Sequence, residues 1–244
     1  MIFTFEVALP LGAIGFYLYD SIVLLYGNEL VFVRSGRRWR VTAGLQLFFG
    51  SRRLSLPGLC QPWTLLFRAA WKEADTRTAV PADWPPQSLV DALGPLKWIC
   101  ATLLLMLLAP LPLISVTWGA GVALLIVFAC FYVLILLALT LVYLRRERLD
   151  LTRAAFWKVA VDALACPPFA INLVHKLTLN KAMPGNPLMF ADARLDAARY
   201  DQLVAVVRSR IEDFLLAEDP DSEAARSLVA LRDGLKERYE RSAE

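Results

Sequence analysis

The chain has 244 residues, 57% of them hydrophobic, and a formal net charge of +3. Soluble domains average about 45–50% apolar residues on a similar count, so this composition argues against an ordinary soluble protein. A single histidine and four cysteines scattered along the chain exclude a multi-histidine metal site and a CxxC site.

Residues 1–27 are predicted to form a first transmembrane helix. The segment is mostly apolar apart from Glu6 and Asp20, and it lacks the basic start and cleavage site of a signal peptide. On one unbroken helix these two carboxylates would lie within about 40° of one face and about 21 Å apart. An intramembrane carboxylate is costly, which leaves two alternatives. Either the two residues line a polar path or contact another subunit, or they are interfacial and Arg34 and Arg40 neutralise Asp20.

Residues 28–78 are predicted to form a small antiparallel β-meander. Glycine-containing turns separate four short runs rich in β-branched and aromatic residues, at 29–34, 37–42, 45–49 and 53–56. A further run at 64–71 is interpreted as a fifth strand or a short helix.

The region 28–97 is basic, with ten Lys or Arg against five Asp or Glu. Because basic loops mark the cytoplasmic side of a membrane, this segment is expected inside and the N-terminus outside. Nucleic acid is not an expected partner, because it usually requires a larger basic excess. Five arginines are instead expected to form a surface for anionic lipid headgroups or a partner protein: Arg37, Arg38, Arg40, Arg52 and Arg53.

A proline-rich linker is predicted for residues 79–95, ahead of a transmembrane helical hairpin at 96–145. The chain has no charged residue over the 47 positions from Trp98 to Leu144, and one spanning helix needs about 20 apolar residues. The run therefore contains two helices, with a turn expected near residues 117–121. Basic residues on both sides of the run place both ends of the hairpin in the cytoplasm.

Residues 146–190 are predicted to contain two amphipathic helices, separated by a Pro-Pro pair. Both helices could lie at the membrane interface or pack on the β-rich segment. Asn172, His175 and Lys176 are expected to share one polar helix face. A lone histidine is most often a hydrogen-bonded structural group.

Residues 191–244 are predicted to form a cytoplasmic helical hairpin. From residue 145 onward the two charge types are balanced at sixteen each, which is typical of solvated helices. Asp219 followed by Pro220 marks the start of the second helix. Each helix has an apolar stripe at a spacing of three to four residues, interpreted as a buried seam between the two. The stripes are Leu203, Val207, Ile211 and Phe214 in the first helix and Leu228, Leu231, Leu235 and Tyr239 in the second. Alternatively, one stripe binds a partner helix.

The sequence carries none of the common catalytic motifs. The patterns GxGxxG, GxxxxGK[ST], HExxH and GxSxG are all missing. We therefore expect no enzymatic activity and no cofactor.

These features predict an α-helical integral membrane protein with three transmembrane helices, a small cytoplasmic antiparallel β-meander and a C-terminal helical domain. The Ala-, Leu- and Arg-rich composition suggests a bacterial cytoplasmic (inner) membrane, with the N-terminus outside and the C-terminus in the cytoplasm. The expected function is that of an accessory or scaffold subunit, whose partners are the lipid bilayer and a protein or a second copy of the chain. The alternative is an oligomeric channel or transporter component that uses Asp20 and Glu6 on a polar path. A third interpretation is a membrane enzyme acting on lipid through His175 or the arginines.

Overall fold

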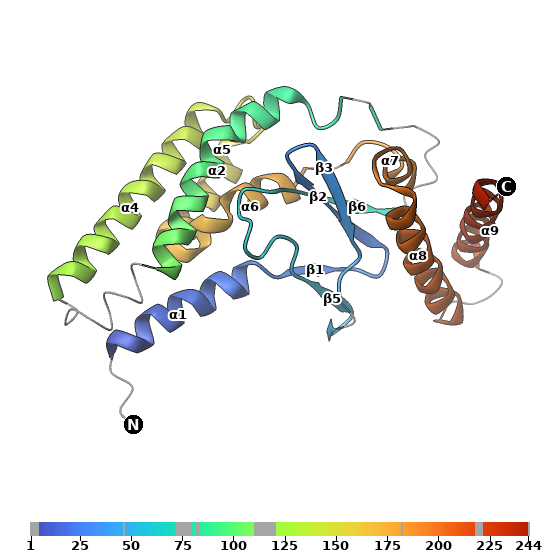
Figure 1. Ribbon diagram of the computed structural model, residues 1–244, viewed down its shortest axis with the longest axis horizontal. Coiled ribbons are helices and arrows are strands. Elements are labelled where there is room, and N and C mark those ends of the chain that lie inside the picture. Colours follow the sequence, from blue (N-terminus) through green and yellow to red (C-terminus); the bar gives the residue numbers. More distant parts are fainter. Residues whose placement is uncertain are drawn as a thin grey trace.

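The computed structural model describes residues 5–45, 47–71, 80–81, 83–109, 121–181, 183–217 and 222–243. This part of the chain is mostly helical, with a small antiparallel sheet region between residues 23 and 70. Figure 1 shows α1, α2 and α4 at one end, the strands in the middle and α8 and α9 at the other end.

Helix α1 (Phe5–Asp20) is shorter than the first predicted span. Pro10 lies inside it, and Ser21 ends it by bonding back to Tyr17 O through its amide and its hydroxyl, the latter at 2.7 Å. Strand β1 (Val23–Leu25) follows almost at once. The prediction of one span to residue 27 was therefore wrong at its end, because a short apolar run fits a helix and a buried strand equally well.

Two of the described helices are long and apolar enough to cross a membrane, α2 (Gln87–Leu108) and residues Leu124–Leu144 of α4 (Gly121–Leu144). They lie side by side (Figure 1). The third predicted span is not confirmed, because the 16 described residues of α1 fall short of that length. The turn expected near 117–121 lies outside the described residues.

Helix α2 begins at Gln87, so much of the segment 79–95 predicted as a linker is helical. Pro95 lies inside α2 and has no N–H to donate to Asp91 O one turn earlier. Arg145, just after α4, supplies the missing donor, because its Nη1 lies 3.2 Å from Asp91 O and 2.9 Å from Ala92 O. A contact between two helices thus accommodates the proline.

The strands form two three-stranded antiparallel sheets, in the orders β1-β5-β4 and β3-β2-β6. The remaining bounds are β2 (Glu29–Ser35), β3 (Arg38–Thr42), β4 (Phe48–Phe49), β5 (Arg52–Ser55) and β6 (Leu65–Ala70). The antiparallel prediction was correct, and the run at 64–71 is a strand. The single meander was wrong, because β6 pairs with β2 through Phe32 and Phe67, and β1 pairs with β5.

The segment after α4 folds back onto helices α2 and α4. It comprises α5 (Arg153–Ala165), the 3₁₀ helix η2 (Pro167–Asn172) and α6 (Leu173–Leu179). Helix α5 packs on α4 and η2, whereas α6 packs on β6 and α2. Of the two placements considered for these helices, α6 therefore takes the one against the β-rich segment.

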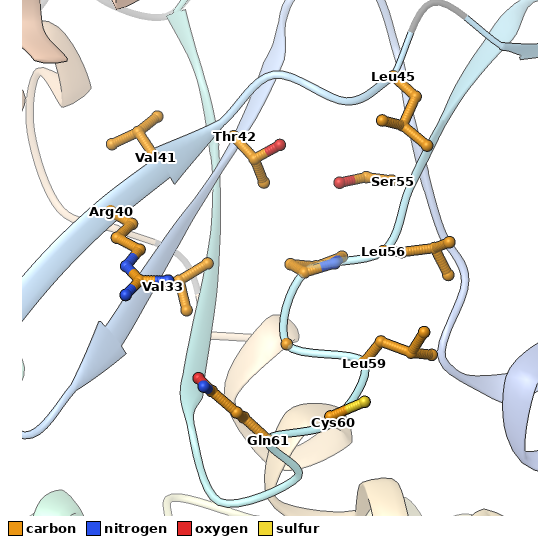
Figure 2. Close-up of a pocket in the computed structure, with 12 residues that line it drawn as sticks. Val33, Arg40, Val41, Thr42, Leu45, Ser55, Leu56, Leu59, Cys60 and Gln61 are labelled. Atoms are coloured by element: carbon orange, nitrogen blue, oxygen red, sulfur yellow. The ribbon is translucent and has the colours of Figure 1, made fainter.

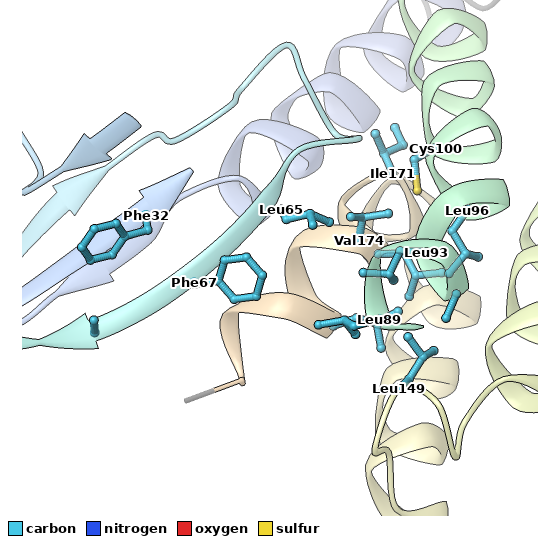
Figure 3. Close-up of a cluster of buried hydrophobic side chains, with 14 of the residues drawn as sticks. Phe32, Leu65, Phe67, Leu89, Leu93, Leu96, Cys100, Leu149, Ile171 and Val174 are labelled. Carbon is cyan, nitrogen blue, oxygen red and sulfur yellow. The ribbon is translucent and has the colours of Figure 1, made fainter. Parts of the chain in front are cut away.

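One apolar core joins the sheet β3-β2-β6 to the helices. Figure 3 shows Phe67 facing Leu93 and Leu96 of α2 across Val174 of α6. All four side chains are fully buried. The sheet β3-β2-β6 is therefore packed directly against helix α2.

The C-terminal end of the described chain comprises α7 (Pro187–Arg194), α8 (Ala197–Ala217) and α9 (Glu223–Ala243). Helices α8 and α9 pack together, and the predicted stripe residues Val207, Leu228 and Leu235 are buried. The predicted helix start at Asp219 and Pro220 lies outside the described residues.

Candidate functional site

The most polar buried arrangement lies where α1 ends. One carboxylate oxygen of Asp20 is 2.9 Å from Lys176 Nζ, and the other accepts a hydrogen bond from Asn172 Nδ2 at 3.1 Å. Asn172 Nδ2 also donates to Ser21 Oγ at 3.0 Å. The Asp20 and Lys176 side chains are only 11% and 22% exposed. The partner of Asp20 is thus Lys176, rather than Arg34 or Arg40 as one alternative proposed.

The local sequence brings these groups together. The cap of α5 at Cys166 precedes Pro167 and Pro168, which start η2, and η2 runs directly into α6. Asn172 and Lys176 are four positions apart on this continuous helical stretch, so they share a face. That face meets the end of α1, and the Lys176 ammonium also lies 4.5 Å from the Phe169 ring centroid.

His175 faces a different partner, the loop at residues 57–64. Its Nε2 lies 3.1 Å from Thr64 Oγ1 and 3.2 Å from Gln61 O. The Thr64 hydroxyl donates to Gln61 O at 2.9 Å, so Nε2 carries the proton and donates to both oxygens. Burial lowers the pKa of His175 to about 4, partly offset by the Gln61 carbonyl. His175 is therefore neutral and holds α6 to this loop.

We call these contacts the polar junction, defined by Asp20, Ser21, Thr64, Asn172, His175 and Lys176. Tyr17 of α1 adds a hydrogen bond from its hydroxyl to Leu59 O in the same loop. The polar junction therefore ties α1, the loop at 57–64 and the η2–α6 stretch to one another. It contains a paired acid, a paired base and a neutral imidazole held by its neighbours, which is an arrangement suited to structural support.

A cavity of about 400 Å³ opens beside the polar junction, between β3 and residues 55–61. Figure 2 shows Arg40, Thr42 and Ser55 on its walls, with the exposed thiol of Cys60 at one end. Most other lining residues are apolar, and no carboxylate or imidazole is among the described lining residues. The cavity thus suits a ligand with a small anionic group and an apolar part better than it suits acid–base chemistry.

The five predicted arginines are divided between two places, the β2–β3 hairpin and strand β5 of the other sheet. Arg37 and Arg38 are exposed at the β2–β3 hairpin, and Arg40 lines the cavity. Arg52 Nη2 donates to Tyr26 Oη at 2.5 Å, and Arg53 pairs with Asp213 of α8 at 3.5 Å. The last predicted site residue, Glu6, lies in the first turn of α1, and its side chain is outside the part that the structure describes.

One residue of structural importance was missed from the sequence. Arg210 of α8 is only 2% exposed, and its guanidinium donates to the carbonyl oxygens of Gly27 and Glu29, each at 3.1 Å, and of Ala43. It thereby fixes α8 to the β1–β2 connection, the start of β2 and the segment just after β3. The available signal was its position beside Ile211 on the predicted apolar stripe of α8, where an arginine is unexpected.

Within the described ranges, no group of three His, Cys, Asp or Glu residues could hold a metal ion. A scan against protein-family models, a search of curated proteins and a search of solved structures each found no match.

Proposed function

We propose that this protein is a non-enzymatic accessory or scaffold subunit of a membrane complex, anchored by its apolar helices and binding a protein partner through its cytoplasmic face. The proposed location is a bacterial cytoplasmic membrane, with the N-terminus outside and the C-terminus inside. The observation that carries the proposal is the pairing of Asp20 with Lys176.

That pair favours an anchor over a channel. A carboxylate held at 2.9 Å by a lysine and at 3.1 Å by an amide is already neutralised, so it is poorly placed to pass ions or protons. A channel component using Asp20 would have to break both contacts. The geometry therefore supports the channel alternative less well than the scaffold.

The exposed surface of α4 supports insertion in a lipid bilayer. Only 33% of the most apolar 18-residue stretch of this helix is buried inside the protein. A core helix of a soluble protein would be mostly buried. Figure 1 shows the start of α1 near the end of α2 and the start of α4. This arrangement agrees with a topology in which the N-terminus and the hairpin connection share one side of the membrane.

A groove beside α8, at the end of the molecule away from α1, α2 and α4, is a suitable binding place for the partner protein. It has a volume of about 380 Å³ and lies between residues 40–44 and α8, with Arg40, Arg199, Gln202 and Val206 among its lining residues. Val206 is an apolar side chain that is 41% exposed at this groove. Exposed apolar side chains rimmed by polar ones are typical of protein-binding surfaces.

Site-specific photo-crosslinking tests the proposal in native membranes. A crosslinking residue at Val206 should yield one discrete product of fixed stoichiometry with a second protein. The same residue at Leu136, which is 53% exposed on α4, should yield mainly lipid adducts.

The scaffold proposal is wrong if Val206 gives no discrete product and the chain is repeatedly isolated in mild detergent as a lone monomer. Reporter fusions after Glu244 and within residues 80–86 test the topology separately. Both should report the cytoplasm, and a periplasmic signal from either one refutes the orientation.

A further inference from the structure

We propose that the β4–β5 hairpin is a second membrane contact, which inserts its apolar tip into the headgroup boundary of an anionic lipid bilayer. The inference rests on the membrane anchoring in the proposed function and not on the identity of any protein partner.

The segment that leads into this hairpin and forms β4 is unusually apolar for an exposed part of the chain. Leu45, Leu47, Phe48 and Phe49 are 46%, 63%, 61% and 73% exposed. β4 is the edge strand of its sheet, and β5 is its pairing partner. Apolar area costs about 25 cal/mol per Å² when left in water, so four such side chains within five positions favour burial in an apolar phase.

Cationic groups sit directly beside the aromatic rings of this region. The Arg53 guanidinium carbon lies 4.7 Å from the Phe48 ring centroid, and that of Arg52 lies 4.5 Å from the Tyr26 ring centroid. Arg53 shares its charge with Asp213, whereas Arg52 has no acidic partner in the part of the chain that is described. Aromatic rings with adjacent arginines are typical of the lipid headgroup level, and a guanidinium that is not paired with a carboxylate complements lipid phosphates there.

The position of the hairpin in the fold also supports contact with the lipid bilayer. β1 begins three residues after the end of α1, and β5 and β4 follow it in the same sheet. Because neighbouring strands are about 4.8 Å apart, β4 lies about 10 Å from β1. Figure 1 shows β5 at the lower edge of the sheet region, toward the side on which α1 begins, and the β2–β3 hairpin at the upper edge. The apolar tip therefore lies close to the level at which α1 would leave the bilayer.

The test uses spin labels on the full chain, reconstituted in phosphatidylcholine vesicles with and without phosphatidylglycerol. The exposed or half-buried thiols are removed by Cys60→Ser, Cys130→Ser and Cys166→Ser, which leaves the buried Cys100. One label is placed by Phe49→Cys at the tip. The matched control is Arg37→Cys, an exposed position on the β2–β3 hairpin.

The expected result is a label at position 49 that collides more often with oxygen than with a water-soluble nickel complex, and a label at position 37 with the opposite preference. Phosphatidylglycerol should increase the preference at position 49, and Arg52→Gln should remove that increase. A label at position 49 that is as open to nickel as the control overturns the inference. So does a label shielded from both reagents, which indicates a protein cover or a second copy.

A third label, placed by Leu136→Cys on α4, separates this inference from the proposed anchoring. If position 136 is lipid-like and position 49 is aqueous, the hairpin inference alone is wrong. If both positions are aqueous, the membrane anchoring is wrong as well.

Discussion

Removing the charge of Lys176 should destabilise the protein, because it leaves a carboxylate with one remaining partner. Asp20 is 11% exposed, and without Lys176 its remaining side-chain contact is the hydrogen bond from Asn172. Lys176→Met keeps most of the aliphatic stem and its packing near Phe169. The change therefore probes the ion pair with little loss of apolar contact.

The burial of the pair sets the expected magnitude. Breaking a fully buried pair costs about 3–5 kcal/mol, and an exposed pair contributes about 0.2–1 kcal/mol. Lys176 is 22% exposed and Asn172 still binds the carboxylate, so we expect a loss of about 2 kcal/mol in the free energy of unfolding. For a chain of this size that loss lowers Tm by about 4–8 °C. The double variant Asp20→Asn/Lys176→Met removes the unpaired charge and should recover about half of the loss.

A buried cysteine can report unfolding in this assay. Cys100 is 0% exposed, so a thiol-reactive fluorogenic dye reports its exposure during thermal unfolding in mild detergent. The other three cysteines are replaced by serine to leave this single reporter. Lys181→Met is the matched control, because its partner Asp150 is 96% exposed and the pair should contribute almost nothing.

A Lys176→Met variant that melts at the same temperature as the Lys181→Met control would contradict a stabilising role for the Asp20–Lys176 pair. A double variant that is no more stable than Lys176→Met would contradict it as well, since the cost would then not come from an unpaired carboxylate.

Three further predictions concern the contacts that hold the β-rich segment. The pKa of His175 falls from 6.5 in the unfolded chain to about 4 in the fold. The free energy of unfolding should therefore be largest above pH 6.5 and should fall by about 3 kcal/mol as the pH drops toward 4. Melting curves of His175→Gln over this range should show a much smaller loss of stability. Arg210→Met removes the side-chain donor to the carbonyls of Gly27 and Glu29 and should cost about 3 kcal/mol in denaturant titrations. Arg208→Met, at a half-exposed position, should be neutral within error. Gly58→Ala places a side chain at φ +75° and 2.8 Å from Thr64 Oγ1, so it should lower the free energy of unfolding by about 1–2 kcal/mol; an unchanged Tm would contradict the strain argument.

The parts of the fold that sequence patterns predicted well depend on near neighbours. The apolar run before Arg145 and helix α4 both end at Leu144. The turn at Ser35–Gly36 separates β2 from β3, as predicted. Gly36 has a φ of +61°, which suits a hairpin turn. Such signals act over a few residues, so one sequence is enough to read them.

The partners of the polar side chains could not be predicted from local sequence patterns. Asp20 and Asn172 were both singled out, yet 152 positions separate them and nothing local indicated that they would meet. The residues expected on one polar face also contact different segments, because His175 lies against Thr64 whereas Lys176 pairs with Asp20. A periodic pattern shows which face of a helix is polar, but the neighbours on that face depend on how distant segments pack.

By itself, the sequence determined the apolar helices, the antiparallel strands and the basic balance of the segment between them. Composition and short-range periodicity specify these features, because they reflect how each residue prefers lipid, water or its own backbone. Tertiary structure alone decided that α1 gives way to β1, that Pro95 stays inside α2 and that the carboxylate of Asp20 is paired internally. Each of these outcomes depends on a donor, strand or cation supplied by a remote segment: β5 for β1, Arg145 for Pro95 and Lys176 for Asp20.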